Sequence, residues 1–423
     1  MSTTASQSRG PGRPPLLEET IGAALRRVAG RFGERDALVS RAQAIRLSYA
    51  QLDAEVDRVA RGLLALDLQP GDRVGIWSPN CAEWTLIQLA TARIGVILVN
   101  VNPAYRTAEL RYALAHSGCR VLVSARAFKT SDYAAMVDEV RGELPDLERV
   151  VWIGDPAWDG FLDGAVQTSD EQLADREAQL AASDPINIQY TSGTTGAPKG
   201  ATLSHRNILN NGYLVGQGCR YTEADRICIP VPFYHCFGMV MGNLAAVVHG
   251  ACMVIPAPAF EALATLEAVQ EERCTSLYGV PTMFIAELDH PEFGRFDLSS
   301  LRTGIMAGSP CPVEVMKRVI ADMHMGEVAI CYGMTETSPV STQTAADDPL
   351  AQRVATVGRV HPHVEVKVAD PATGEPVARG ETGELCTRGY SVMLGYWNDP
   401  ARTAEAIDAG GWMHTGDLAV MDA

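Results

Sequence analysis

The chain has 423 residues, which is more than one ordinary hydrophobic core holds and predicts two or more subdomains. Hydrophobic residues make up 47% and charged residues 20%, as is typical of a globular protein. The sequence contains no run of about 18 apolar residues, so we expect no membrane span. The formal net charge of −16 argues against a nucleic-acid-binding surface.

The cysteines and the N-terminus bear on the compartment. Ten cysteines are scattered among apolar runs without a C-x-x-C pair, so the sequence indicates neither a zinc site nor a disulfide framework. Residues 1–15 are small, polar and proline-rich, and we expect them to be disordered. They lack the apolar core of a secretory signal, so a reducing compartment, the cytoplasm, is expected.

Strand and helix signals alternate through the first part of the chain. Ser48 and Gln51 have the spacing of a capping box, and an apolar stripe of helical period follows them. Strands are predicted at residues 73–77, 96–99 and 121–123, and helices at 81–95 and 107–116. This alternation predicts a mostly parallel, doubly wound α/β sheet.

A second alternating region follows residue 190. Its predicted strands are 227–229, 253–255, 276–278, 304–306 and 328–330, and its predicted helices lie near 204–215, 261–272, 281–289 and 312–323. After residue 345, period-two alternation at 364–368 and a Gly-rich turn before 383–388 predict a small β-rich subdomain. We therefore divide the chain into a tail (1–15), two α/β subdomains (16–190 and 191–345) and the β-rich subdomain (346–423).

The most informative stretch is residues 190–200, Tyr-Thr-Ser-Gly-Thr-Thr-Gly-Ala-Pro-Lys-Gly, which follows a short predicted strand. Glycines let backbone N–H groups turn toward an anion, hydroxyls add donors, and the lysine adds positive charge. The nucleotide P-loop differs, because its lysine directly follows its second glycine. The candidate phosphate-binding residues are Thr191, Ser192, Gly193, Thr194, Thr195, Gly196 and Lys199.

A second informative stretch is residues 331–337, Cys-Tyr-Gly-Met-Thr-Glu-Thr. The ring of Tyr332 can stack on a flat base, and the hydroxyl of Thr335 can donate to an α-phosphate. Glu336 offers the hard oxygen ligands that Mg²⁺ prefers, so it is the candidate metal ligand.

Together with residues 230–239, 278–282, 306–310 and 411–418, these stretches resemble the adenylate-forming superfamily of acyl-CoA synthetases, luciferase-like enzymes and peptide-synthetase adenylation domains. The resemblance implies ATP, Mg²⁺ and coenzyme A as cofactors, a distorted barrel as the β-rich subdomain, and a site divided into three sets of residues. The implied catalytic residues are Lys199, His235, Thr335 and Glu336. The phosphate loop, Gly308, Ser309, Pro310, Tyr332, Gly333, Thr335 and the ribose-binding Asp417 would hold the nucleotide. His235, Phe237, Gly238, Gly279, Met306 and Met334 would line the acyl site.

The implied reaction joins a small-molecule carboxylic acid to ATP as acyl-AMP, from which coenzyme A takes the acyl group as a thioester. Catalysis would rest on positioning and on charge stabilisation at the phosphates. Residues 233–237 contain no acid that would hold an amino group, and their neighbourhood is apolar and pliable, so we predict a medium-chain fatty acid first and aryl acids next. Two alternatives are an adenylation enzyme that loads a carrier protein and an adenylate-binding protein with little catalysis.

In the superfamily a small C-terminal lid domain follows the ribose-binding aspartate and supplies a catalytic lysine. This chain ends at Ala423, soon after Asp417, so we expect it to be the large N-terminal domain without the lid domain. On that expectation it binds ATP and acyl-adenylate but catalyses poorly. A homodimer is one assembly that the sequence leaves open.

Overall fold

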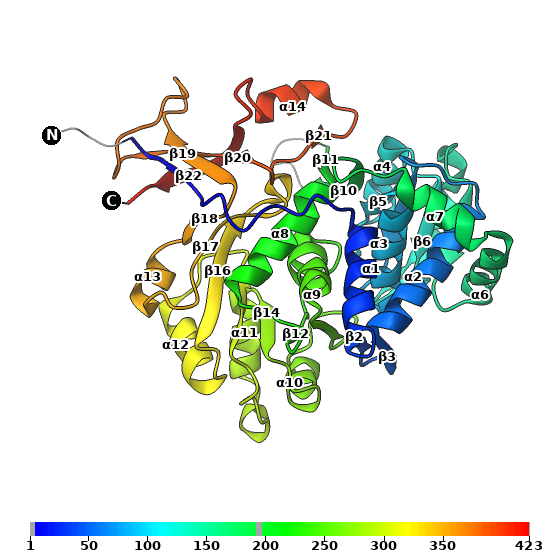
Figure 1. Ribbon diagram of the computed structural model, residues 1–423, viewed down its shortest axis with the longest axis horizontal. Coiled ribbons are helices and arrows are strands. Elements are labelled where there is room, and N and C mark those ends of the chain that lie inside the picture. Colours follow the sequence, from blue (N-terminus) through cyan, green and yellow to red (C-terminus); the bar gives the residue numbers. More distant parts are fainter. Residues whose placement is uncertain (1–4, 192–196, 423) are drawn as a thin grey trace.

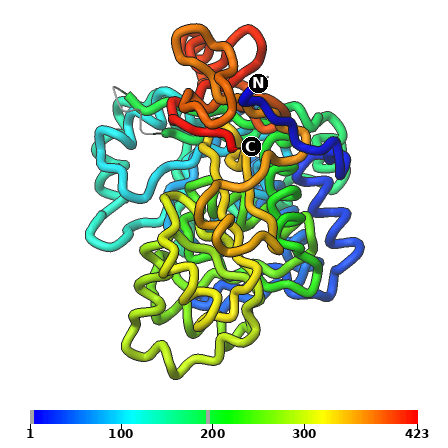
Figure 2. Tube along the Cα trace, turned by 90° about the vertical axis from the view of Figure 1, so that its left-hand side faces the viewer, coloured from blue at the N-terminus to red at the C-terminus, as the bar shows by residue number. Residues whose placement is uncertain are grey.

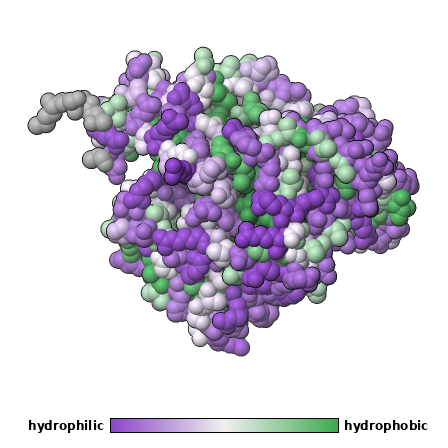
Figure 3. Space-filling view, viewed as in Figure 1, coloured by the Kyte–Doolittle hydropathy of each residue, from purple (hydrophilic) through white to green (hydrophobic). Residues whose placement is uncertain are grey.

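The computed structural model describes residues 5–191 and 197–422 and contains two large sheets and a smaller one, with helices packed against the large sheets (Figure 1). Within these ranges no helix is both long and apolar enough to cross a bilayer. Figure 3 shows one face of the molecule, on which polar residues predominate and apolar ones are scattered.

The first large sheet has seven strands. In spatial order they are β21 (Gly395–Tyr396), β11 (Lys199–Ser204), β10 (Pro185–Thr191), β5 (Ile97–Asn100), β4 (Arg73–Trp77), β6 (Val121–Ser124) and β9 (Arg149–Trp152). The strands from β10 to β9 are parallel, whereas β11 and β21 extend the sheet antiparallel. The predicted strand 73–77 and the predicted parallel arrangement are confirmed.

The second large sheet has nine strands. In spatial order they are β18 (Arg359–Val360), β17 (Val340–Gln343), β16 (Glu327–Gly333), β15 (Thr303–Ala307), β14 (Ser276–Gly279), β12 (Arg226–Cys228), β13 (Cys252–Ile255), β2 (Asp36–Ser40) and β3 (Ile45–Ser48). Its six inner strands, β16 to β2, are parallel, and antiparallel strands close both edges.

Helices cover both large sheets, as the doubly wound pattern predicts. They are α1 (Ile21–Phe32), α2 (Tyr49–Leu64), α3 (Ala82–Ile94), α4 (Thr107–Ser117), α5 (Tyr133–Val140), α6 (Pro156–Asp163), α7 (Asp170–Ala178), α8 (His205–Gly218), α9 (Ala245–His249), α10 (Ala262–Glu271), α11 (Pro281–Leu288), α12 (Val313–Asp322), α13 (Leu350–Ala355) and α14 (Pro400–Ala406). A hairpin of β7 (Ala127–Phe128) and β8 (Ser131–Asp132) precedes α5. The capping box at Ser48 and Gln51 is present at the start of α2.

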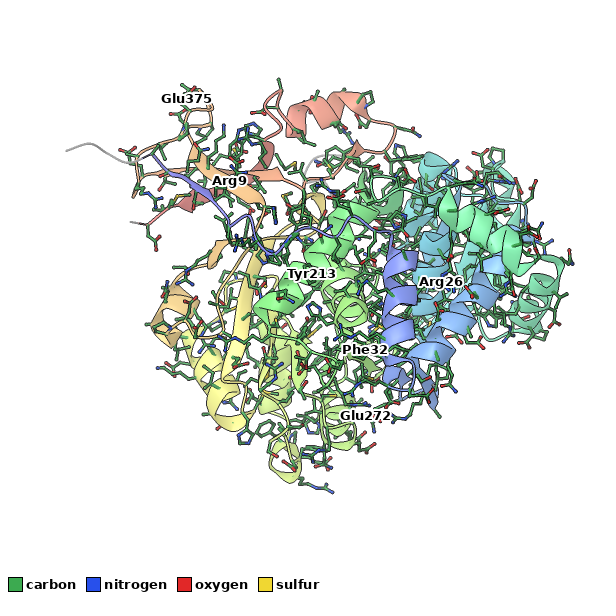
Figure 4. The ribbon with its side chains drawn as sticks, in the orientation of Figure 1. Arg9, Arg26, Phe32, Tyr213, Glu272 and Glu375 are labelled. Carbon is green, nitrogen blue, oxygen red and sulfur yellow. The ribbon has the colours of Figure 1, made fainter. Side chains whose placement is uncertain are left out.

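A buried charge cluster ties the first helices together. Arg93 of α3 is fully buried and pairs with Asp53 and Asp57 of α2 and with Glu177 of α7. Arg26 of α1, labelled in Figure 4, reaches the same three carboxylates. Breaking such a network by removing one partner is strongly destabilising, so these four helices are held in one arrangement.

The β-rich part is an antiparallel sheet with the order β1 (Gln7–Arg9), β19 (Val364–Ala369), β20 (Thr382–Gly389) and β22 (Met413–Val420). The predicted β-rich subdomain is confirmed, and among the described residues its strands form an open, four-stranded order. The expected disorder of residues 1–15 is wrong for its described part: Ser6 is fully buried and β1 pairs with β19. Figure 2 shows the N-terminal segment beside the C-terminal strands, and Arg9 is labelled there in Figure 4. The prediction from polar composition failed because β1 is held by backbone pairing with β19, to which side-chain polarity is no guide.

The predicted subdomain boundaries do not follow the sheets. Strands β2 and β3, from the range 16–190, belong to the nine-stranded sheet, and β21, from the range 346–423, belongs to the seven-stranded one. Strand β11, from the range 191–345, lies in the seven-stranded sheet, although the later strands of that range lie in the nine-stranded one. Strand β18, from the range 346–423, also lies in the nine-stranded sheet. The physical reason is that hydrophobic periodicity identifies a strand but not its partner.

Candidate active site

Strands β10 and β11 hold the two ends of the predicted phosphate loop. Thr191, the last residue of β10, and Lys199, the first of β11, are cross-strand partners. The predicted Ser192, Gly193, Thr194, Thr195 and Gly196 lie outside the described residues. The pairing therefore fixes where the loop leaves and rejoins the sheet.

Glu336 follows β16 in a short 3₁₀ turn, η5 (Thr335–Thr337), and faces the loop ends from the other large sheet. Its Oε1 accepts a 2.9 Å hydrogen bond from the phenol of Tyr396 in β21 and lies 3.4 Å from the hydroxyl of Thr191. The residue is only 4% exposed, and among the described residues no cation pairs with it. A buried carboxylate without a cation is costly, so this position favours an added cation.

Magnesium fits this carboxylate chemically. One oxygen of Glu336 is already held by Tyr396 and Thr191, and Oε2 has no hydrogen-bond partner within the described ranges. Carboxylate oxygen is a ligand that Mg²⁺ prefers, and Mg²⁺ in such sites is commonly shared with substrate phosphates. Glu336 is therefore the residue here that would hold the ion.

Lys199 contacts the same tyrosine that donates to Glu336. Its Nζ is 4.6 Å from the ring centroid of Tyr396, so one tyrosine contacts both the lysine and, through its phenol, Glu336. Burial, and next Glu336, raise the pKa of the Tyr396 phenol, so it stays a donor. Sequence reasoning missed Tyr396, because Gly395-Tyr396-Trp397 carries no charged or glycine-rich signal.

The predicted base-stacking and ribose-binding residues meet. The phenol of Tyr332, at the end of β16, donates a 2.6 Å hydrogen bond to Asp417 Oδ2 on β22. Asp417 is exposed, and Tyr332 is half-buried, as residues that contact a ligand from outside would be. Gly333 beside Tyr332 has no room for a side chain, since a Cβ would lie 1.8 Å from the carbonyl oxygen of Pro339.

Gly308, Ser309 and Pro310 are exposed at the carboxyl end of β15, next in the sheet to β16. Ligands in open α/β sheets bind at these strand ends. Gly308 has a φ of +90°, which favours glycine, so its identity has a backbone explanation as well as the predicted nucleotide role.

Two of the residues predicted for the acyl site, Phe237 and Gly238, begin a π-helical segment, η3 (Phe237–Leu244). The ring of Phe237 stacks on Tyr278 of β14 at a centroid distance of 5.6 Å, and Met334 packs against the same core. Gly238 is close to the backbone of Pro232, 2.4 Å from where a Cβ would sit, so this turn requires glycine. π-Helical turns are frequent at functional sites, which suits this placement.

His235 is exposed just before η3, and its ring lies 4.8 Å from that of Tyr234. Desolvation by the protein around it lowers its pKa below the ordinary histidine value, so it is neutral at pH 7. The next residue, Cys236, is buried, and the side chain of Thr335 is close enough to affect the pKa of its thiol. The structure therefore brings His235 close to the η5 turn.

Two predicted acyl residues are placed differently. Met306 is fully buried and packs in the core with Phe284 and Met316, whereas its neighbour Ile305 faces the core that Phe237 contacts. Successive side chains of a strand point to opposite faces, so Met306 lies on the wrong face of β15 for the predicted role. A Cβ on Gly279 would lie 3.0 Å from Phe284, so tight packing against α11 accounts for that glycine.

Buried amides beneath the π-helical segment were not predicted. Asn100 donates to the carbonyl of Tyr234 at 3.0 Å, and Gln88 donates to the carbonyl of Met239 at 3.1 Å. Gln189 lies 3.3 Å from the Cys236 thiol, which donates to it. The bonds from Asn100 and Gln88 satisfy one backbone carbonyl before η3 and one within it, and the bond from the Cys236 thiol helps to fix the turn before η3. Their signal in the sequence is a polar amide inside an apolar strand, for Asn100 and Gln189, or inside an apolar helix, for Gln88.

Comparison with known proteins covers most of the chain. A family model described as AMP-binding enzyme matches residues 25–397. The chain is 46% identical over 426 residues to the putative acyl-CoA synthetase YngI of Bacillus subtilis, covering 96% of this chain and 77% of that protein. It is 42% identical over 435 residues to the mitochondrial medium-chain acyl-CoA ligase ACSF2 of Bos taurus, covering 96% and 70%.

Two solved structures are similar to this chain over nearly all of its length. The N-terminal domain of FACL13 from Mycobacterium tuberculosis superposes with a TM-score of 0.84 at 26% identity, covering 96% of this chain and 97% of that one. The anthranilate CoA ligase AuaEII, in complex with anthranoyl-AMP, superposes with a TM-score of 0.86 at 25% identity, covering 97% and 77%.

Proposed function

This chain belongs to the AMP-binding enzyme family and is an acyl-CoA synthetase of the AMP-forming type, and on that premise we propose that it activates a medium-chain fatty acid with ATP and Mg²⁺ before transfer to coenzyme A. The observation that carries the proposal is the buried carboxylate of Glu336, which faces the two ends of the predicted phosphate loop and pairs with no cation in the described part of the chain.

One set of residues would contact the phosphates of ATP, and another set would contact its nucleoside. Lys199 and the Thr191 hydroxyl would contact phosphate oxygens, and Glu336 would hold Mg²⁺, which would neutralise phosphate charge. Tyr332 and Asp417 would contact the base and the ribose. Fixed donors and charges lower the barrier by stabilising charge that develops at phosphorus, and they need little rearrangement when the reaction occurs.

The acid would lie along Phe237 and Met334, beside neutral His235. An apolar wall disfavours charged side chains because they would lose hydration, while a flexible methionine adapts to an alkyl chain. The bovine relative is named as a medium-chain ligase, and this supports an alkyl substrate of medium length. The neighbour AuaEII acts on anthranilate, and this keeps an aryl acid as the second candidate.

Thermal denaturation with non-hydrolysable acyl-adenylate analogues of increasing chain length tests the proposal. A ligand that binds the folded state raises its melting temperature, by an amount that grows with affinity. We expect the largest shift with a medium-length alkyl chain. A larger shift with an anthranoyl analogue would favour the aryl acid, and no shift with any analogue would contradict the adenylate site. The cytoplasmic location stays a prediction, and the bovine relative is named as mitochondrial.

A further inference from the structure

A thiol, an imidazole and a carboxylate converge on one face of the β-rich sheet. Cys386 of β20 and His414 of β22 are cross-strand partners, and Glu384 lies two residues before Cys386 on the same face. Their ligand atoms all lie within 4.8 Å of one another. None of the three belongs to the adenylate site described above.

We propose that Glu384, Cys386 and His414 form a binding site for a zinc-class divalent cation. Thiolate, imidazole and carboxylate are the ligand types of zinc sites, and three protein ligands leave a fourth position for water. Sequence spacing does not reveal this site, because the ligands come from two strands rather than from a C-x-x-C pair.

The distances between the ligand atoms suit this ion. Sγ of Cys386 is 3.7 Å from Nδ1 of His414, and zinc bonds at a tetrahedral angle would place sulfur and nitrogen about 3.5 Å apart. Nδ1 is 2.9 Å from Oε2 of Glu384, the length of a hydrogen bond, and the same geometry needs an opening to roughly 3.3 Å. A movement of a few tenths of an ångström would admit the ion.

Groups outside the three ligands support the arrangement. The other nitrogen of His414, Nε2, is 3.8 Å from Oδ2 of Asp408, and metal-binding histidines commonly direct their second nitrogen to a carboxylate. Oδ1 of Asp408 accepts hydrogen bonds from the backbone of Gly410 and Trp412, so its position is fixed. The second oxygen of Glu384 accepts a bond from the backbone N–H of Gly416.

The exposure of the three side chains is also consistent with an ion that enters from solvent. Cys386 is fully buried, whereas the side chains of Glu384 and His414 are 16% and 30% exposed. The ion would therefore enter from the side of the imidazole and carboxylate and keep a solvent-facing position. Because Gly416 lies directly before Asp417, a bound ion would also fix the turn that carries the exposed aspartate.

Calorimetric titration of the metal-free chain with Zn²⁺ tests the site, with Mg²⁺ as a comparison ion. We expect one Zn²⁺ per chain, no response to Mg²⁺ at these residues, and a cobalt–thiolate absorption band when Co²⁺ is the probe. Cys386→Ser should lower the affinity for Zn²⁺ by more than about 100-fold, since loss of an outer-sphere partner alone costs about 10- to 100-fold. It should also abolish the cobalt band.

Two further variants keep the result interpretable. Glu384→Gln preserves the hydrogen bonds to His414 and Gly416 but removes the charged ligand, so it should fold and bind Zn²⁺ at least about tenfold more weakly. Cys311→Ser changes a partly buried cysteine outside the cluster and should bind like the parent chain. Unchanged Zn²⁺ affinity in both Cys386→Ser and Glu384→Gln, or no stoichiometric binding by the parent chain, would overturn the proposal.

Discussion

The phenol of Tyr396 donates a 2.9 Å hydrogen bond to the carboxylate of Glu336, joining the edge of the seven-stranded sheet to a turn of the nine-stranded sheet. The same ring contacts Lys199, so one side chain touches both charged groups of the predicted phosphate site. Tyr396 is thus a positioning residue between the two large sheets.

Replacing Tyr396 with Phe should lower the free energy of unfolding by about 1.5–3 kcal/mol, the contribution of a hydrogen bond to a charged group. Urea denaturation without nucleotide measures it. Tyr390→Phe is the matched control, because its buried phenol contacts the neutral amide of Asn211 and should cost only about 0.5–1.5 kcal/mol. Equal losses in the two variants would contradict a charged partner for Tyr396.

Glu336→Gln should weaken the Mg²⁺ dependence of ATP binding. The amide retains an oxygen for the Tyr396 phenol but loses the charge that attracts the ion. Calorimetric ATP titrations with Mg²⁺ and with a chelator give the comparison: removing Mg²⁺ should weaken binding in the parent chain and have little effect in the variant. The same ratio in both proteins would remove Glu336 as the ligand.

Lys199→Ala should weaken ATP binding by about tenfold or more, since a charge-assisted contact contributes about 1.5 kcal/mol or more. Its folding should change little, because the present partner of Nζ is an aromatic ring, a contact of about 0.5–1 kcal/mol at exposed sites. Lys317→Ala, on the exposed face of α12, serves as the control and should bind ATP normally. An unchanged ATP affinity for Lys199→Ala counts against its phosphate role.

Gly333→Ala should destabilise the turn that carries Thr335 and Glu336. The added methyl would lie 1.8 Å from a backbone oxygen, and overpacking of this kind costs about 1–3 kcal/mol or more. Gly326→Ala meets nothing within 4 Å and should change stability by less than about 0.5 kcal/mol. The melting temperatures of the two variants are compared. Equal melting temperatures would show that the turn accommodates the added methyl group without loss of stability.

His205 makes stability fall in acid. It is fully buried and accepts a hydrogen bond from the N–H of Ile21, and desolvation lowers its pKa to about 3. Between the unfolded value of about 6.5 and that folded value, the unfolded chain binds the extra proton, so stability falls by about 1.4 kcal/mol per pH unit as the pH drops. The contribution of the neutral form is fully present above pH 6.5.

Urea unfolding at pH 6.5 and pH 5 measures this slope. His205→Asn keeps an acceptor for the N–H of Ile21 and removes the titration, so it should lose about 2 kcal/mol less than the parent chain over that interval. His324→Asn, at an exposed residue with a left-handed φ of +61° that asparagine tolerates, should leave the slope unchanged. Identical slopes for the parent chain and His205→Asn would contradict the argument.

Much of the fold could be predicted from the sequence, because periodicity reports which residues face a core. Strand 73–77 and the helix that ends at Gly95 are confirmed, the latter by a left-handed φ at that glycine. Partner choice could not be predicted: β2 pairs on one side with β13, which lies far along the chain, and β1 pairs with β19.

The sequence likewise predicts only part of the candidate site. Tyr332, Glu336 and Lys199 were identified because their stretches have distinctive residue types and order. Met306 was assigned to the acyl wall, but the alternation of β15 turns it to the opposite face. Tyr396 became visible only through its contacts, since a tyrosine between apolar neighbours looks like any core residue.

The pairing of β1 with β19 also bears on self-association. Beyond β1, Gly10 donates to the carbonyl of Val364 and Pro11 accepts from His363, so the segment covers one long side of β19. A chain trimmed to begin after residue 15 would expose that row of backbone donors and acceptors, and such edges recruit strands from other molecules. The N-terminal segment therefore acts as a built-in cap against edge-to-edge aggregation.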